Sequence, residues 1–263
     1  MKFGKLSTFF PALALFGLGL APNLSAQCLV SDPFNGSLLS AWTTLGIGGA
    51  TGTTAVGAAL TITSQDTGVA ISGTTDSFTY LAQSVAGDPE ITLEIDSMPA
   101  SVGGRAGLML RASGTGNGNI YFFVGVNTTA GGASPSGNYF IQDRATTGGT
   151  STALTTGGTW TSAAPAYVRV TKIGTGFNGF YSSDGSSWTR IGGFTNIGGF
   201  PGGAYNAGIA MSSTVNAPPG GSVAARNFNV LAGFCTPTST PTATPTPTVT
   251  LTPTITLTST KTP

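Results

Sequence analysis

The chain of 263 residues is poor in charge and rich in glycine. Charged residues make up 7% of it and Gly occupies 40 positions, against roughly 25% and roughly 7% in ordinary globular proteins. His is absent, which excludes Ser-His-Asp and Cys-His catalysis and His-based metal sites. Lys and Arg form no cluster, which argues against nucleic-acid binding.

Residues 1–26 have the three-part pattern of a secretory signal peptide. Lys2 and Lys5 precede an apolar stretch at 9–20, and small residues follow up to Ala26. The apolar stretch is too short for a stable membrane span, and prolines interrupt it. We expect cleavage after Ala26, secretion, and no membrane insertion of the mature chain. A lipid anchor or a retained membrane anchor is the alternative, although Gln27 stands where a lipobox needs its cysteine.

Two cysteines bracket the candidate domain, which spans residues 27–235. Cys28 and Cys235 are the chain's two cysteines. Because an exported chain meets an oxidising compartment, we expect a Cys28–Cys235 disulfide that joins the two ends of the domain. In the chain-entropy model a loop of this length gives about 5 kcal/mol at most.

Between the cysteines, short alternating segments are cut by Gly, Asn, Ser and Asp. Turn signals recur at roughly 8–12 residues, which indicates a sandwich or barrel, and no stretch keeps a helical apolar period. The Gly- and Thr-rich stretch 146–159 is interpreted as a loop. The candidate strands are residues 56–63, 77–85, 89–97, 105–112, 119–126, 137–142, 166–173, 176–182, 187–191, 205–211 and 222–231.

The alternation gives several strands one apolar face and one polar face. Carboxylates lie on the polar face of 89–97, and arginines lie on those of 105–112 and 166–173. Two interpretations stay open: cross-strand ion pairs, which contribute little each, and a polar face that binds a ligand. The charged residues on these faces are Glu90, Glu94, Asp96, Arg105, Arg111 and Arg169.

Residues 236–263 form a Thr/Pro-rich tail in which every even position up to Thr262 is Thr. Proline cannot donate to a β-ladder, and the tail has too few apolar residues to form a core. We expect a disordered, extended and often O-glycosylated stalk or linker. Either the chain is truncated after Pro263 or the tail reaches a cell surface.

Several segments together resemble the concanavalin-A-like lectin/glucanase superfamily, nearest the laminin-G-like modules of bacterial secreted proteins. The resemblance spans about residues 31–231 and implies an all-β fold, a two-sheet antiparallel jelly-roll sandwich with one concave face. The superfamily includes lectins, carbohydrate-binding modules, adhesion modules and glycosidases, so the resemblance does not decide the function. The segments are 31–36 (SDPFNG), 39–42 (LSAW), 104–111 (GRAGLMLR), 167–172 (YVRVTK), 177–189 (FNGFYSSDGSSWT) and 226–230 (RNFNV).

The carboxylates do not match the catalytic pattern of the superfamily's glycosidases, a Glu-x-Asp-x-x-Glu-like strand. Glu94 and Asp96 supply its first two positions, but Met98 and Pro99 stand where the third carboxylate should follow. Glu90 and Glu94 share a face at roughly 13 Å in an extended strand, too far for either glycosidase geometry. We therefore expect a non-catalytic protein, with a glycoside hydrolase as the weaker alternative.

Sugars bind to aromatic faces and short polar groups, and the aromatic candidates are Trp42, Trp160, Trp188, Tyr121, Tyr139, Tyr167 and Tyr181. Trp160 stands out because it follows the expected loop 146–159, and loops at sheet edges carry function. The segment 182–188 contains Asp-Gly, which predicts a hairpin turn. The ligand-binding residues that the sequence favours are Trp160, Tyr121, Tyr167, Arg111, Arg169 and Glu94.

Modules related by the resemblance sometimes bind calcium, for which Asp32, Asp66, Asp76 and Asp143 are the candidate ligands. No segment resembles a calcium-binding repeat. The sequence thus predicts a secreted, non-catalytic binding module for a polysaccharide or cell-surface glycan. The alternative is a structural or adhesion protein that packs against other surface proteins.

Overall fold

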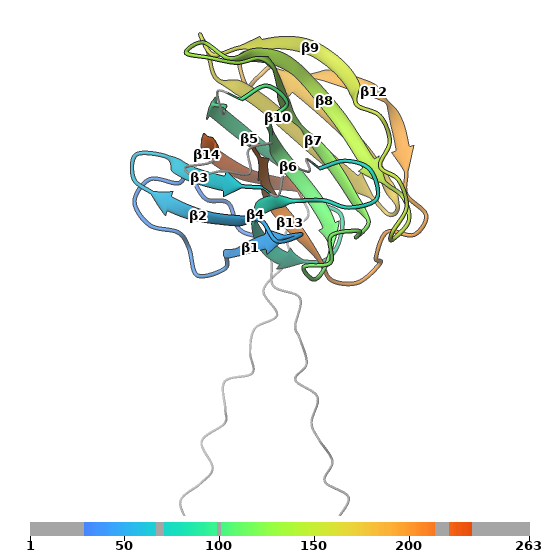
Figure 1. The fold of residues 1–263 in the computed structure, drawn as a ribbon. Coiled ribbons are helices and arrows are strands. Elements are labelled where there is room, and N and C mark those ends of the chain that lie inside the picture. The colour runs from blue at the N-terminus through green and yellow to red at the C-terminus, as the bar shows by residue number, and fades with distance from the viewer. Residues whose placement is uncertain (1–28, 67–70, 99–100, 214–220, 233–263) are drawn as a thin grey trace, which may run out of the picture.

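The computed structural model describes residues 29–66, 71–98, 101–213 and 221–232. These residues form a sandwich of two seven-stranded antiparallel sheets (Figure 1). The two-sheet all-β fold predicted from the sequence is confirmed. No helix in these ranges is long and apolar enough to cross a membrane. The predicted signal peptide, the Thr/Pro-rich tail, Cys28 and Cys235 lie outside the described residues.

The first sheet has the strand order β1-β4-β13-β6-β7-β8-β9. Strand β13 comes late in the chain but lies between two early strands, as the crossovers of a two-sheet sandwich require. The strands are β1 (Thr43–Ile47), β4 (Phe78–Val85), β13 (Tyr205–Ser212), β6 (Arg105–Ala112), β7 (Tyr121–Ala130), β8 (Ser136–Arg144) and β9 (Thr155–Thr161).

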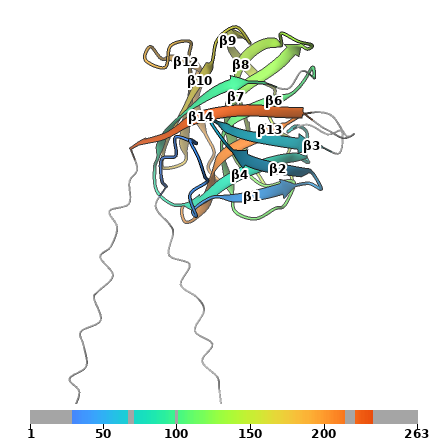
Figure 2. The same cartoon turned by 90° about the vertical axis from the view of Figure 1, so that its left-hand side faces the viewer.

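The second sheet has the order β12-β11-β10-β5-β14-β3-β2. Figure 2 shows β14, β3 and β2 running side by side. The strands are β12 (Thr189–Asn196), β11 (Gly176–Ser182), β10 (Ala166–Ile173), β5 (Glu90–Ser97), β14 (Gly221–Ala232), β3 (Leu60–Gln65) and β2 (Thr51–Val56).

The strand predictions succeed where alternation is strong. Strands β6, β10 and β11 have the predicted bounds. The predicted strand 56–63 is wrong in its extent, because a turn after Val56 separates β2 from β3. The predicted loop 146–159 is wrong at its end, because β9 begins at Thr155 and pairs with β8. Its sequence TTGGTWT has no apolar alternation, so only the pairing reveals it as a strand.

The core lies between the sheets and follows the alternation. Ile91, Leu93 and Ile95 of β5 are buried there together with Val168 and Val170 of β10. Burying an aliphatic side chain of this size stabilises the fold by about 1.5–3 kcal/mol. The sheets approach so closely at Gly179 of β11 that a Cβ there would overlap Ile141 of β8.

The outer face of the first sheet is buried as well. Phe78, Tyr80, Met109, Phe123 and Phe140 form a second apolar cluster there, completely removed from solvent. Loops lie against this face, and several of the hydrogen bonds that hold them come from one buried ionic cluster.

That cluster joins Asp76 to two arginines. Arg144 donates from both terminal nitrogens to the two oxygens of Asp76, at 2.6 and 2.8 Å, and Arg111 donates to Oδ2 at 3.3 Å. Burial raises the pKa of Asp76, and the two guanidinium groups oppose that rise. Arg144 also donates to the backbone oxygens of Gly73, from Nη2, and Gly149, from Nε. The cluster therefore fastens the loops before β4 and after β8 onto the sheet.

Candidate functional site

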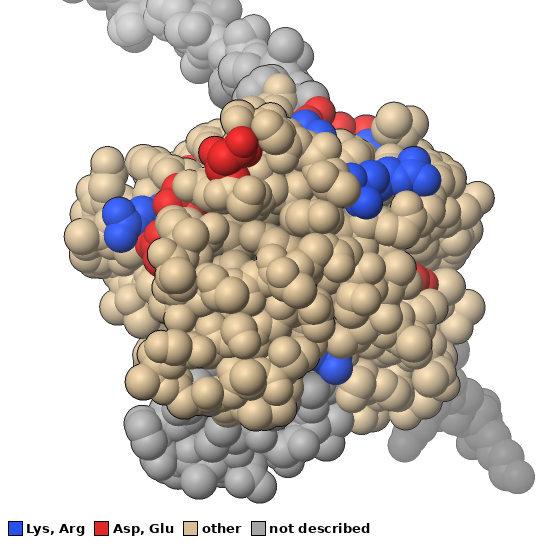
Figure 3. Space-filling model, turned by 90° about the horizontal axis from the view of Figure 1, so that it is seen from above, with Lys and Arg blue, Asp and Glu red and all other residues tan. Residues whose placement is uncertain are grey.

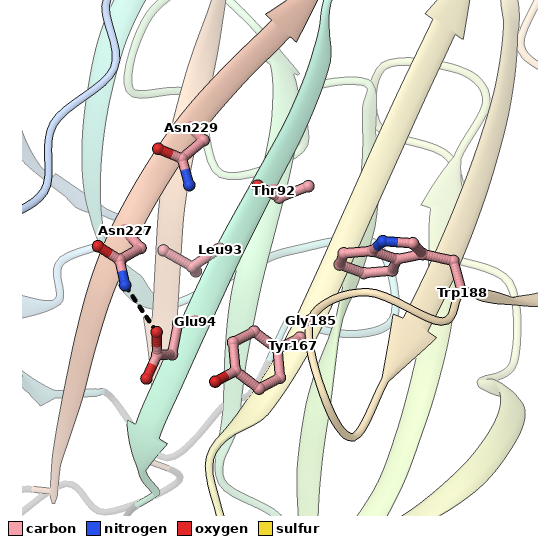
Figure 4. Close-up of a pocket in the computed structure, with 8 residues that line it drawn as sticks. All are labelled: Thr92, Leu93, Glu94, Tyr167, Gly185, Trp188, Asn227 and Asn229. Atoms are coloured by element: carbon pink, nitrogen blue, oxygen red, sulfur yellow. Dashed lines mark hydrogen bonds between the residues drawn. The ribbon is translucent and has the colours of Figure 1, made fainter.

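A pocket of about 120 Å³ opens on the outer face of the second sheet. Its floor lies on β5, β10 and β14, which are adjacent in that sheet, and the turn between β11 and β12 contributes one side (Figure 4). The lining residues are Thr92, Leu93, Glu94, Tyr167, Gly185, Trp188, Asn227 and Asn229.

Strand pairing places these side chains in two rows. Glu94 of β5 is opposite Tyr167 of β10, and Thr92 is opposite Asn229 of β14. Figure 4 shows the rings of Tyr167 and Trp188 on one side of the pocket and Asn227, Asn229 and Glu94 on the other. The pocket thus has one aromatic wall and one wall of amide and carboxylate groups.

A bulge in β14 directs Asn227 into the polar wall. The pairing of β14 with β5 shifts register between Arg226 and Asn229, and Asn227 has a positive φ of 50°. Asn tolerates this left-handed conformation better than most residues, and bulges commonly redirect a side chain. From this position the Asn227 amide donates to Glu94 Oε2 at 2.7 Å.

The aromatic wall includes the phenol of Tyr167, which lies beside acidic groups. Partial burial raises the pKa of Tyr167, and the nearby carboxylates of Glu94 and Asp96 raise it further. A hydrogen bond between the phenol and Glu94 acts in the same direction, so the phenol is protonated at neutral pH and joins the aromatic wall to the polar wall.

The turn that carries Trp188 is organised by Asp184. Its Oδ1 accepts hydrogen bonds from the backbone N–H groups of Ser186 at 2.8 Å and Ser187 at 2.7 Å. These bonds hold the pKa of Asp184 well below its usual range. Gly185 has a φ of +72°, and a Cβ there would lie 3.1 Å from the Tyr167 ring. The turn therefore lies against Tyr167 and needs glycine at this position.

Arg169 lies behind the aromatic wall. Its guanidinium carbon is 4.7 Å from the centroid of the Trp188 ring and 4.5 Å from that of Phe180. One terminal nitrogen forms an ion pair with Glu90 at 3.1 Å. A cation over an aromatic face attracts its π electrons, so Arg169 helps to fix the orientation of Trp188.

The structure brings together half of the ligand-binding residues favoured by the sequence. Glu94 and Tyr167 line the pocket, and Arg169 contacts Trp188. The other three lie elsewhere and are buried. Trp160 is 3% exposed and packs in the core from β9, while Tyr121 and Arg111 are 0% exposed beneath the loops on the first sheet. Only Glu94, Tyr167 and Arg169 therefore stay candidates for contact with a ligand from solvent.

Sequence reasoning did not select Trp188 from its aromatic candidates, and it missed Asn227 and Asn229. The signal for Trp188 was present in the Asp-Gly turn that precedes it, which lifts the ring over β10. The alternation of β14 breaks at Arg226-Asn227, where two polar residues follow one another and both are exposed, and Asn is unfavourable in a strand interior. Such polar residues in the middle of a strand are a usable sign of a bulge.

The four aspartates proposed for calcium do not converge. Among the residues that the structure describes, no group of three or more Asp, Glu, Cys or His side chains is arranged to hold a metal ion. Each carboxylate binds a different neighbour, with Asp32 accepting from Trp42, Asp66 from Ser212, Asp76 from Arg144 and Asp143 from Thr152.

Comparison with solved structures identifies the same fold at low sequence identity. A functionally unknown protein from Saccharomyces cerevisiae matches with a TM-score of 0.53 and 16% identity, over 74% of this chain and 98% of its own. A xylan β-1,4-xylosidase from Bacillus halodurans matches with a TM-score of 0.54 and 11% identity, over 76% of this chain and 38% of the enzyme.

A GH43 glycoside hydrolase with endo-xylanase and exo-arabinofuranosidase activity matches with a TM-score of 0.52 and 15% identity, over 84% of this chain and 44% of the enzyme. This chain spans less than half the length of the two hydrolases. No protein-family model and no curated protein sequence matches it. At these identities the likeness shows the fold alone. That fold is a two-sheet β-sandwich, while membership of the concanavalin-A-like superfamily and the nearer likeness to laminin-G-like modules stay predictions.

Proposed function

We propose that this chain is a secreted, non-catalytic module that binds a polysaccharide or a cell-surface glycan. The observation that carries the proposal is the pocket on the second sheet, where Tyr167 and Trp188 face Asn227, Asn229 and Glu94. The pocket is open to solvent, whereas the aromatic side chains that form the two hydrophobic clusters of the described residues are buried.

The two walls suit the two kinds of surface on a sugar ring. The C–H face of a pyranose is apolar and packs against an aromatic ring, as other apolar groups do. Its hydroxyl groups both donate and accept hydrogen bonds, which matches the two amides and the carboxylate. A few convergent polar groups beside an apolar surface are typical of small-molecule sites.

Export supports the same proposal. The signal-peptide pattern of residues 1–26 predicts that the mature chain meets extracellular glycans, and the Thr/Pro-rich tail is typical of stalks that hold a module away from a surface. The solved hydrolases that share the fold act on glycans, which is compatible with a carbohydrate-associated role. The fold by itself does not supply that role.

The test is retention of the full secreted chain on insoluble polysaccharides and on a glycan array, compared with Trp188→Ala. We expect wild type to be retained and the variant to lose about tenfold or more in affinity, the effect of removing a binding hot spot. Phe194→Ala is the matched control, because Phe194 is an exposed aromatic on β12 outside the pocket. Equal retention of all three proteins would overturn the proposed site.

Adhesion to other surface proteins is the alternative. A chain that binds no glycan in these assays and cross-links to proteins on intact cells supports adhesion and contradicts the proposed function.

A further inference from the structure

A second pocket, of about 240 Å³, lies on the same sheet as the first. It is formed where β5 begins and β10 ends, and its lining residues are Asp88, Pro89, Glu90, Thr171, Lys172 and Ile173. Glu90 is the cross-strand partner of Thr171, just as Glu94 is of Tyr167. The two pockets are therefore four residues apart along both strands, roughly 13 Å.

The strip between the pockets is continuous. Thr92, which lines the first pocket, is opposite Arg169. Arg169 forms an ion pair with Glu90, which lines the second pocket, and it stacks on Trp188 of the first. The Arg169 side chain thus contacts residues of both pockets. The outward residues Thr92 and Thr171 on this strip have short side chains.

The cations in and around the two pockets already have acidic partners. Arg169 is paired with Glu90 at 3.1 Å, Lys172 with Asp88 at 2.7 Å and Arg226 with Asp96 at 2.6 Å. Glu94 adds a further negative charge in the first pocket. In the described part of the chain, neither pocket is lined by a cation left over for a carboxylate or sulfate on a ligand. An anionic sugar would meet net repulsion from Glu94 here.

We propose that the two pockets together bind an internal stretch of a linear, uncharged polysaccharide that runs along β5 and β10. This inference rests on the proposed function and extends it from a sugar site to a chain site. The first pocket, with Trp188, is the principal subsite. The second, bordered by Ile173 at 71% exposure, is the extension that only a longer chain reaches.

The test is calorimetric titration of the full chain with oligosaccharides of one to six residues from xylan, cellulose, mannan and β-1,3-glucan. With at least one of these series, we expect affinity to rise about tenfold or more from the disaccharide to the hexasaccharide. A tenfold rise corresponds to about 1.4 kcal/mol from the additional subsite. Polygalacturonic acid is the charged probe, and we expect it to bind at least tenfold more weakly than the best neutral hexasaccharide.

Two variants separate this inference from the proposed function. Ile173→Ala is expected to weaken hexasaccharide binding severalfold and leave disaccharide binding unchanged, whereas Trp188→Ala weakens both. Equal affinity for disaccharide and hexasaccharide, with both lost in Trp188→Ala, would overturn the chain site and leave the proposed function standing. Absence of binding to every probe would overturn both, and tight binding of polygalacturonic acid would overturn the selection for uncharged chains.

Discussion

The outer faces of the two sheets carry similar residues and have opposite surroundings. On the first sheet, Arg111 and Tyr121 lie beneath loops and are completely buried. On the second sheet, Arg169 and Tyr167 stay partly exposed beside a pocket. Figure 3 shows how few charged side chains reach one side of the surface. The comparison shows that the loops decide the environment of an Arg or a Tyr on the polar side of a strand. Where loops cover the face, the residues are buried, and where they leave it open, the residues can line a binding site.

The largest expected effect is a loss of stability at the covered outer face of the first sheet. Asp76→Asn leaves Arg111 and Arg144 without their shared carboxylate. Removing one partner of a buried ionic group typically costs about 3–5 kcal/mol, and we expect a loss of that size in the free energy of unfolding by urea.

The matched control for that change is Asp96→Asn, which breaks the exposed pair with Arg226. Its cost should stay under about 1 kcal/mol. Equal costs for the two variants would show that the covered face of the first sheet does not depend on its ionic cluster.

The next effect concerns the turn between β11 and β12, which contributes one side of the pocket on the second sheet. In Gly185→Ala the new alanine has to adopt a positive φ, and its Cβ presses against Tyr167. We expect a loss of about 1–2 kcal/mol of stability together with weaker glycan binding. In Gly193→Ala, on β12, the Cβ meets open space, so this control should bind as wild type does. Unchanged stability and binding in Gly185→Ala would contradict the role given to the turn.

The smallest effect is a pH dependence at Asp184. Its pKa is lowered in the folded chain by the N–H groups of Ser186 and Ser187, so the stability it contributes is present above the ordinary Asp pKa of about 3.9. That contribution decreases progressively below this value and is gone once the pH has fallen through the lowered pKa of the folded chain. The stability difference between wild type and Asp184→Ala should therefore be constant from pH 8 to 5 and shrink below about pH 4. A difference that instead grows on acidification would contradict this assignment.

Alternation made much of the fold predictable. A period of two fixes which side chains of a strand share a face, and it correctly placed Glu94 on the polar face of β5 and Tyr167 and Arg169 on the polar face of β10. Strand β9 was not predicted because its Thr and Gly residues have no apolar pattern, and it forms by pairing with β8.

The rest of the candidate site depends on departures from regular pairing. Trp188 reaches the pocket through a turn, and Asn227 reaches it through a bulge with a positive φ. Neither follows from alternation. The same alternation put Arg111 on an outward face of β6, and only the loops fastened by Asp76 determine that this face is sealed.

The most direct test of the contrast between the faces is hydrogen exchange of the full chain, with and without a saturating neutral hexasaccharide. The account predicts added protection in the turn 183–188 and in β14 around Asn227, and unchanged exchange in the loop 145–154 over the first sheet. Protection of the loop 145–154, with none in the turn, would contradict it.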